Sequence, residues 1–270
     1  MDNAKLGTAI VITSGKGGVG KTTTSANIGT GLAILGKSVV VLDADIGLRN
    51  LDVVMGLENR IVYDIVDVVE KNCRLKQALI RDKRFDKLYL LPAAQTRDKS
   101  AVKPEQMVEL LNDLKEDFDY IIIDSPAGIE QGFQYSIAGA DLAVIVTTPE
   151  ISAVRDADRV IGILEAKGLN NPKLIINRTR PDMVKRGDMM NREDIEDILA
   201  IDLLGIVPDD EEIVISTNKG EPVVIERRTL AGNAYMNIAK RITGEEVEFL
   251  DIENENEGKF SKILKLIFGK

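Results

Sequence analysis

The sequence predicts a doubly wound α/β domain, in which helices cover both faces of a mostly parallel sheet. Short apolar runs rich in β-branched residues recur along the chain, and longer helical patterns separate them. Runs that are apolar on both faces are typical of central strands in a parallel sheet, because helices bury both sides of such a sheet. In addition, five of the runs end in small or polar residues, as expected where strands meet a ligand.

Each element can be placed by its residues. Strands are expected at 8–14, 38–45, 87–93, 119–128, 141–149, 173–178 and 203–210. Helices are expected at 22–35, directly after the first strand, and at 104–117, where Pro104 suits a first-turn position. The polar strand endings should line one crevice at the carboxyl edge of the sheet. They lie at 14–15, 43–45, 124–128, 147–149 and 177–178.

The composition limits the chemistry of this crevice. The chain has 270 residues, of which 44% are hydrophobic and 29% charged, and its net charge of −9 argues against a nucleic-acid footprint over the whole surface. We expect one large cytoplasmic domain, because we find neither a membrane-spanning apolar stretch nor a signal peptide. Histidine is absent and Cys73 is the single cysteine, so catalysis must use carboxylates, lysines and bound ions.

The stretch SGKGGVGKTT, residues 14–23, is the strongest signal in the sequence. It satisfies the G-x-x-x-x-G-K-[ST] spacing of a P-loop NTPase and lies between an apolar strand and a helical pattern. Backbone N–H groups of such a turn cradle phosphate oxygens, the lysine bridges the terminal phosphates, and the threonine ligates Mg²⁺. We therefore expect a nucleotide site built from Gly15, Lys16, Gly17, Gly18, Val19, Gly20, Lys21, Thr22 and Thr23.

Carboxylates complete the predicted site. Asp124 ends the run YIIID and suits the acidic element that holds Mg²⁺, and Gly128 beyond it could sense the γ-phosphate through its N–H. Asp43 and Asp45 end another strand; one of them could orient the attacking water, whereas the other could cap the turn. The sequence leaves the individual roles of Asp43 and Asp45 open.

Lys16 is a second lysine in a loop that already has its phosphate lysine. One lysine neutralises only part of a triphosphate, and many P-loop enzymes take further positive charge from another molecule. Lys16 could therefore reach across an interface to the phosphates of a partner subunit, which would couple dimerisation to hydrolysis. The alternative is that Lys16 is a solvent-exposed side chain on a loop.

The motif KGGVGKTT, with Lys16 in place, resembles the deviant Walker A motif of the MinD/ParA family of P-loop ATPases. In that family the additional lysine serves the partner subunit of an ATP-bound dimer. The resemblance implies ATP and Mg²⁺ as cofactors, Lys16 acting in trans, Lys21 as the phosphate lysine and Asp45 as the residue that positions water. It also implies that Thr22, Asp43 and Asp124 lie near the metal. Asn177 would contact the adenine base, and Arg178 and Pro208 would contact the nucleotide beside Asn177.

Further stretches resemble the septum-site branch of this family, at 43–68, 90–101, 147–162 and 177–190. Iron-protein relatives need additional cysteines that this chain lacks. The resemblance implies an ATP-held homodimer, recruitment of the division inhibitor MinC, and MinE or another topological factor as a stimulator of hydrolysis, with no specific nucleic-acid partner. The alternative function is that of a ParA-like ATPase, whose dimer binds DNA non-specifically with an affinity that falls steeply with salt.

The composition changes after the last helical pattern. We expect a P-loop domain at 1–244, an acidic flexible linker at 245–258 and an amphipathic helix at 259–270. That helix would lie in an anionic membrane surface on the inner face of the cell membrane, while the alternative is a helix docked on the protein's own core. Its lysines lie away from an apolar face formed by Phe260, Ile263, Leu264, Ile267 and Phe268.

Overall fold

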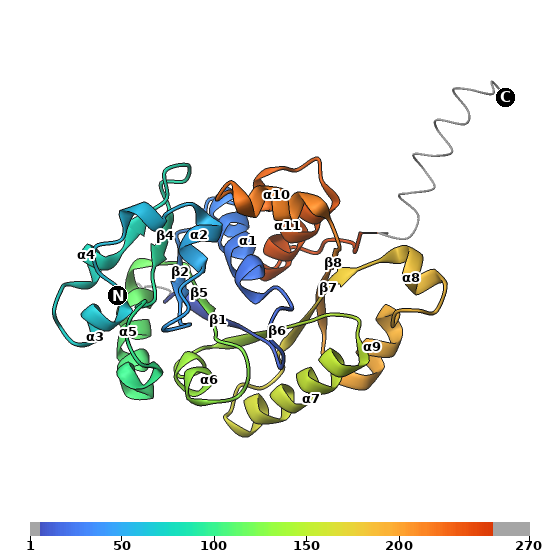
Figure 1. Ribbon diagram of the computed structural model, residues 1–270, viewed down its shortest axis with the longest axis horizontal. Helices are drawn as coiled ribbons and strands as arrows, with labels where there is room; N and C mark the ends of the chain where they lie inside the picture. Colours follow the sequence, from blue (N-terminus) through green and yellow to red (C-terminus); the bar gives the residue numbers. More distant parts are fainter. Residues whose placement is uncertain (1–5, 251–270) are drawn as a thin grey trace, which may run out of the picture.

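A single eight-stranded sheet runs through the middle of the structure, a computed structural model that describes residues 6–250. The strands lie in the order β3-β4-β2-β5-β1-β6-β7-β8 (Figure 1). All neighbouring strands pair in parallel except β3 and β4, which pair antiparallel. The predicted doubly wound α/β class is confirmed.

Seven strands match the apolar runs of the sequence. They are β1 (Thr8–Thr13), β2 (Val39–Asp43), β4 (Leu88–Leu91), β5 (Tyr120–Asp124), β6 (Leu142–Thr147), β7 (Lys173–Thr179) and β8 (Leu203–Pro208). The remaining strand, β3 (Ile80–Arg81), has two residues, which is too short for a hydrophobic pattern to predict it.

Helices fill the connections between the strands except the short one from β3 to β4. Both predicted helices are present, with Pro104 in the first turn of the second one. The α-helices are α1 (Lys21–Ile34), α2 (Leu51–Met55), α3 (Ile65–Val69), α4 (Leu75–Ala78), α5 (Pro104–Asp117), α6 (Gln131–Ser136), α7 (Ile151–Ala166), α8 (Pro181–Lys185), α9 (Arg192–Leu199), α10 (Glu211–Asn218) and α11 (Leu230–Ile242). Three short 3₁₀ turns occupy Glu58–Arg60, Lys99–Ala101 and Val223–Ile225.

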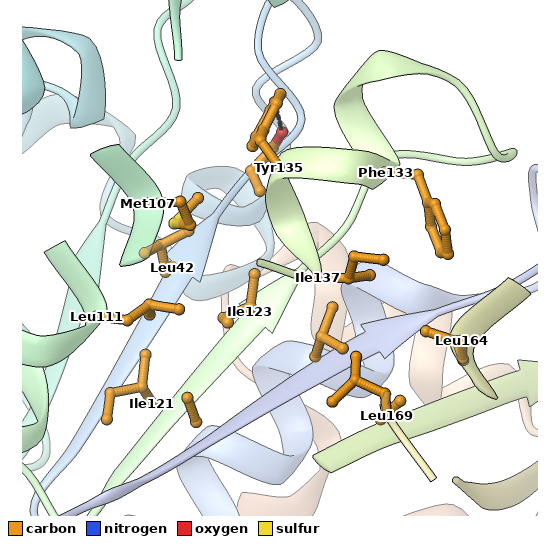
Figure 2. Packing of buried hydrophobic residues seen from close by; sticks show 14 of the residues in the cluster. Leu42, Met107, Leu111, Ile121, Ile123, Phe133, Tyr135, Ile137, Leu164 and Leu169 are labelled. Carbon is orange, nitrogen blue, oxygen red and sulfur yellow. Dashed lines mark hydrogen bonds between the residues drawn. The ribbon is translucent and has the colours of Figure 1, made fainter. Parts of the chain in front are cut away.

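The two faces of the sheet are buried in separate apolar clusters. Along β1, Ala9 and Val11 enter the cluster shared with α5, α6 and α7, whereas Ile10 and Ile12 enter the cluster shared with α1 and α11. Figure 2 shows the first cluster, in which the side chains of β5 face those of α5. Because successive side chains of a strand point to opposite faces, burying both sets requires a helical layer on each side of the sheet.

The last described residues are held on the edge of the domain. Arg241 of α11 donates hydrogen bonds to the backbone carbonyls of Val247 and Glu248 and to that of Leu204 on the edge strand β8. The ring of Phe249 lies 4.5 Å from the guanidinium carbon of Arg192 and 4.1 Å from that of Arg241. Residues 247–249 therefore form a strap that contacts both α9 and α11.

This strap includes the first part of the segment expected to be a flexible linker. Composition alone does not show that Phe249 meets two arginines, because those arginines lie far apart in the sequence. The division of the chain at 244 and 258 stays a prediction, and the expected amphipathic segment at 259–270 lies outside the described residues. Within residues 6–250, no helix is long and apolar enough to cross a membrane.

Replacing Phe249 with alanine is expected to loosen the strap. Each contact between a guanidinium and an aromatic ring is worth about 0.5–1 kcal/mol at an exposed site, so the free energy of unfolding should fall by about 1–2 kcal/mol. For a domain of this size the melting temperature should then drop by about 2–8 °C, measured by circular dichroism. Phe249→Tyr keeps the ring and serves as the control; equal melting of the alanine variant and the wild type would contradict the assignment.

Candidate active site

The predicted site residues meet at the carboxyl edge of the sheet. The loop 14–20 joins β1 to α1, and Asp43 ends β2 beside Asp124, its register partner at the end of β5. Asn177 and Arg178 lie near the end of β7, and Pro208 ends β8, the edge strand next to β7. Parallel pairing brings these strand ends to one edge of the sheet, as expected.

The phosphate loop depends on glycine at several positions for different reasons. Gly18 and Gly20 have φ angles of +79° and +98°, a left-handed backbone that side chains disfavour. At Gly15 a Cβ atom would lie 2.2 Å from the carbonyl oxygen of Asp156, so the backbone of α7 approaches too closely for a side chain. Residues 15–18 of the loop are half-buried or exposed and lie just ahead of the N-terminus of α1, where a phosphate cradle is expected.

The two lysines of the loop occupy different environments. Lys21 is buried, and its Nζ donates to Ser14 Oγ at 2.9 Å. Burial lowers the pKa of Lys21, while the nearby carboxylates of Asp124 and Asp45 act in the opposite direction. The Lys16 side chain is 44% exposed, and its Nζ lies 3.4 Å from Glu150 Oε2 and 3.4 Å from Ser152 Oγ, at the start of α7. Lys21 thus lies inside the cradle, whereas Lys16 lies at its rim.

The donor groups beside Lys21 suit a magnesium ion. Asp124 is buried, accepts a hydrogen bond from Ser25 Oγ at 2.9 Å and is hydrogen-bonded to Thr22. Hydroxyl and carboxylate oxygens are the ligands that Mg²⁺ prefers. Among residues 6–250 no three or more Asp, Glu, His or Cys side chains form a metal-binding group, so phosphate oxygens and water would have to complete the coordination shell.

Asp43 and Asp124 carry unusual protonation properties. Burial and the neighbouring carboxylate of Asp124 raise the pKa of Asp43 to about 8, although the backbone N–H groups of Asp45 and Leu51 donate to it. Burial likewise raises the pKa of Asp124 to about 6, against the hydrogen bonds from Thr22 and Ser25. Two buried carboxylates side by side favour the binding of a cation, because a cation relieves both desolvation and mutual repulsion.

Asn177 links the outer part of the site to the phosphate loop. Its Nδ2 donates to the carbonyl of Val19 at 2.8 Å, and a Cβ atom on Gly20 would lie 2.3 Å from that nitrogen. The Oδ1 atom of Asn177 is buried and has no hydrogen-bond partner within the described part of the chain. An orphaned buried acceptor at this place fits the exocyclic amino group of an adenine base. Arg178 beside it is exposed and has a left-handed φ of 57°.

The structure adds residues that the sequence did not single out. Ser25 bonds to Asp124 and Glu150 contacts Lys16, whereas Ser14, which bonds to Lys21, was among the expected polar strand endings. Ser25 follows Lys21 by one helical turn, so a helical projection of α1 could have placed its hydroxyl near the site. No sequence pattern links Glu150 to Lys16, because 134 positions separate the two residues.

Comparison with known proteins identifies the family. A family model described as "CobQ/CobB/MinD/ParA nucleotide binding domain" matches residues 10–223. The chain belongs to the MinD/ParA family. It is a P-loop ATPase, as the resemblance in the sequence implied, and the nucleotide-binding domain covers the site described above.

Relatives place this MinD/ParA ATPase close to septum-site proteins. It is 60% identical to the septum site-determining protein MinD of Bacillus subtilis over 266 residues, which cover 98% of this chain and 99% of that protein. A MinD structure from a MinC:MinD complex of Aquifex aeolicus shares 51% identity with a TM-score of 0.84, covering 89% of this chain and 97% of that one. Pyrococcus horikoshii MinD complexed with Mg-ADP shares 29% identity with a TM-score of 0.80, covering 88% and 96% of the two chains.

The raised pKa of Asp43 gives a test by pH. In the nucleotide-free protein the folded state holds a proton on Asp43 up to about pH 8, whereas an unfolded aspartate releases it near pH 3.9. Stability contributed by this proton is therefore complete at low pH and is lost as the pH rises toward 8. Asp43→Asn mimics the protonated acid, so at pH 8 it should melt at a higher temperature than the wild type.

The measurement is thermal melting of the ATPase without nucleotide between pH 5 and pH 8, a window below and up to the pKa of about 8. The matched control is Asp86→Asn, whose side chain is 93% exposed and which should keep the wild-type decline. If the Asp43→Asn variant declined as steeply as the wild type between pH 6 and pH 8, Asp43 would not be the group responsible.

Proposed function

We propose that this ATPase is a molecular switch that dimerises on ATP, binds the inner membrane surface through residues 259–270 and recruits a MinC-type division inhibitor to place the septum. The observation that carries the proposal is the separation of the two loop lysines. Lys21 lies inside the phosphate cradle, and Lys16 lies partly exposed at its rim. An exposed pair such as Lys16 with Glu150 is worth about 0–1 kcal/mol, so Lys16 can exchange this partner for the phosphates of a second subunit at little cost.

The proposed hydrolysis divides the work among residues of this chain. Lys21 neutralises charge on the terminal phosphates, and Lys16 of the second subunit supplies the positive charge that one lysine cannot. Thr22, Asp43 and Asp124 hold Mg²⁺, which would neutralise phosphate oxygens when bound. Asp45 orients the attacking water, and Asn177, Arg178 and Pro208 line the adenine end of the site. A monomer lacks the second lysine, so hydrolysis is slow until the dimer forms.

The strength of membrane binding depends on how many C-terminal segments (residues 259–270, here called tails) one assembly carries. Burying an apolar side chain is worth up to about 1.5–3 kcal/mol, and each lysine near anionic lipid about 1 kcal/mol, but the ordering of a short helix offsets much of this. One tail therefore binds marginally. In a dimer the second insertion is intramolecular, which raises avidity by about 10²–10⁴. ATP-dependent dimerisation would thereby control membrane occupancy.

One of the relatives supports the proposed division-inhibitor partner. The Aquifex aeolicus relative is described as part of a MinC:MinD cell division protein complex, and its MinD chain is 51% identical to this one. We propose a division inhibitor of the same kind as the partner of the membrane-bound dimer, and MinE or another topological factor as the stimulator of hydrolysis. The first proposal rests on likeness to that complex, and the second on the resemblance of the sequence to the septum-site branch of the family.

Co-sedimentation with anionic liposomes tests the membrane function. The full chain should pellet with Mg·ATP but not with Mg·ADP, because only the dimer presents two tails. A chain truncated after Gly258 should stay in the supernatant under both conditions. Failure to pellet under every condition would reject the membrane function, and ATP-dependent binding to DNA that weakens with salt would then favour a ParA-like function.

Lys16→Ala tests the role of the second subunit. If Lys16 acts in trans, the wild-type turnover number should rise with protein concentration as dimers form, and the variant should lose most of this increase. An arginine finger raises kcat by about 10³-fold or more, so the turnover number of the dimeric variant should fall by a similar factor. The matched control is Lys76→Ala, which removes a more exposed lysine from a surface ion pair with Asp117 on α5. A turnover number independent of concentration, and unchanged in Lys16→Ala, would reject the proposal.

A further inference from the structure

A tyrosine on α6 holds the backbone on both sides of Asp45. Tyr135 is 1% exposed, and its hydroxyl donates a hydrogen bond to the carbonyl of Ala44. The backbone N–H of Ile46 donates to the same hydroxyl oxygen. Both peptide groups that flank Asp45 are therefore hydrogen-bonded to the hydroxyl of Tyr135. Figure 2 shows Tyr135 at the end of the apolar cluster, with its hydroxyl engaged.

Further hydrogen bonds hold the same segment at other atoms. Ala44 donates its N–H to the carbonyl of Asp124 at 3.0 Å, and Asp45 donates its N–H to the side chain of Asp43 at 2.9 Å. These two bonds hold the segment toward β5 and β2. Beyond them, the carbonyl of Asp45 accepts from the N–H of Leu48 at 3.1 Å, and the N–H of Gly47 donates to the carbonyl of Ala94 at 2.9 Å. The Ala44 carbonyl and the Ile46 N–H belong to fully buried residues, and a buried peptide group that loses its partner costs free energy, so the segment would shift to find another.

The hydroxyl is well suited to this task. Burial raises the pKa of Tyr135 above its ordinary value, and the charges of Asp45 and Asp43 add to the effect. The group therefore stays protonated across the physiological range and can always donate to the carbonyl. Its helix begins at Gln131, directly after the loop that contains Gly128, so the same helix connects the expected γ-phosphate contact to Asp45.

We propose that Tyr135 is a positioning residue for ATP hydrolysis, which fixes the backbone of Asp45 so that its carboxylate can orient the attacking water. The inference rests on the proposed role of Asp45. Orientation of a nucleophile is sensitive to small displacements, because a shift of about 1 Å can cost about a hundredfold in rate. Binding of the nucleotide depends on other residues, so Tyr135 should affect turnover rather than affinity.

The test removes one oxygen atom. Tyr135→Phe keeps the ring in the core and deletes the hydroxyl, while Ser136→Ala deletes a neighbouring buried hydroxyl that bonds only within α6, to the carbonyl of Phe133. Turnover is measured per bound nucleotide, so that unfolded protein does not count. We expect kcat of Tyr135→Phe to fall about tenfold with KM for Mg·ATP within about twofold, and Ser136→Ala to stay within about twofold in both values.

A double variant separates this inference from the role of Asp45. If Tyr135 acts through Asp45, adding Tyr135→Phe to Asp45→Asn should lower single-turnover hydrolysis no further, whereas additive losses would overturn the inference. If Asp45→Asn alone kept wild-type turnover, the proposed role of Asp45 would fail instead. Amide exchange gives a second readout, since Ile46 should lose protection in Tyr135→Phe but not in Ser136→Ala. A kcat of Tyr135→Phe within about twofold of wild type would also overturn the inference.

Discussion

The parallel pairing of β1 with β5 on one side and β6 on the other is the interaction on which the rest of the structure depends. It places the carboxyl ends of the central strands at one edge, where the chain must leave the sheet for the covering helices. The phosphate loop and Asp124 are close to one another for this reason, and the parallel pairing of β2 with β5 adds Asp43 beside Asp124. A slip of one residue between β1 and β5 would separate the loop from Asp124 and turn the apolar side chains of the strand toward the wrong layer.

This arrangement brings negatively charged side chains together at a buried place that solvent hardly reaches. Asp43 and Asp124 are at most 2% exposed and lie at matching positions of adjacent strands. In the nucleotide-free protein their charges are moderated by Lys21, by backbone N–H groups and by protons held to unusually high pH. A magnesium nucleotide would replace those protons with a divalent charge. The buried carboxylates are therefore electrostatically unfavourable in the free protein, and ligand binding relieves this. Preorganised catalytic sites commonly show such strain.

The segment from Asp43 to Ile46 shows how several elements share the placement of one side chain. The strand β2 delivers Asp43, the N-terminus of α2 donates to its carboxylate, β5 holds Ala44, and α6 contributes the hydroxyl of Tyr135. No single element determines where Asp45 lies. Such convergence on one backbone turn suits a residue whose orientation matters more than its affinity for a ligand.

The sequence by itself determined the fold class, seven of the strands and the nucleotide site, because each follows from a local pattern. Apolar runs identify strands that are buried on both faces, and glycine, lysine and threonine at fixed spacing identify a phosphate loop whatever surrounds it. Tertiary structure decided everything that depends on residues distant in the chain. The contact of Lys16 with Glu150, the clamp of two arginines on Phe249, and the hydroxyl of Tyr135 beside Asp45 each join segments with no shared pattern. Spacing along the chain carries no information about such pairs, since only the packing of helices on the sheet brings them together.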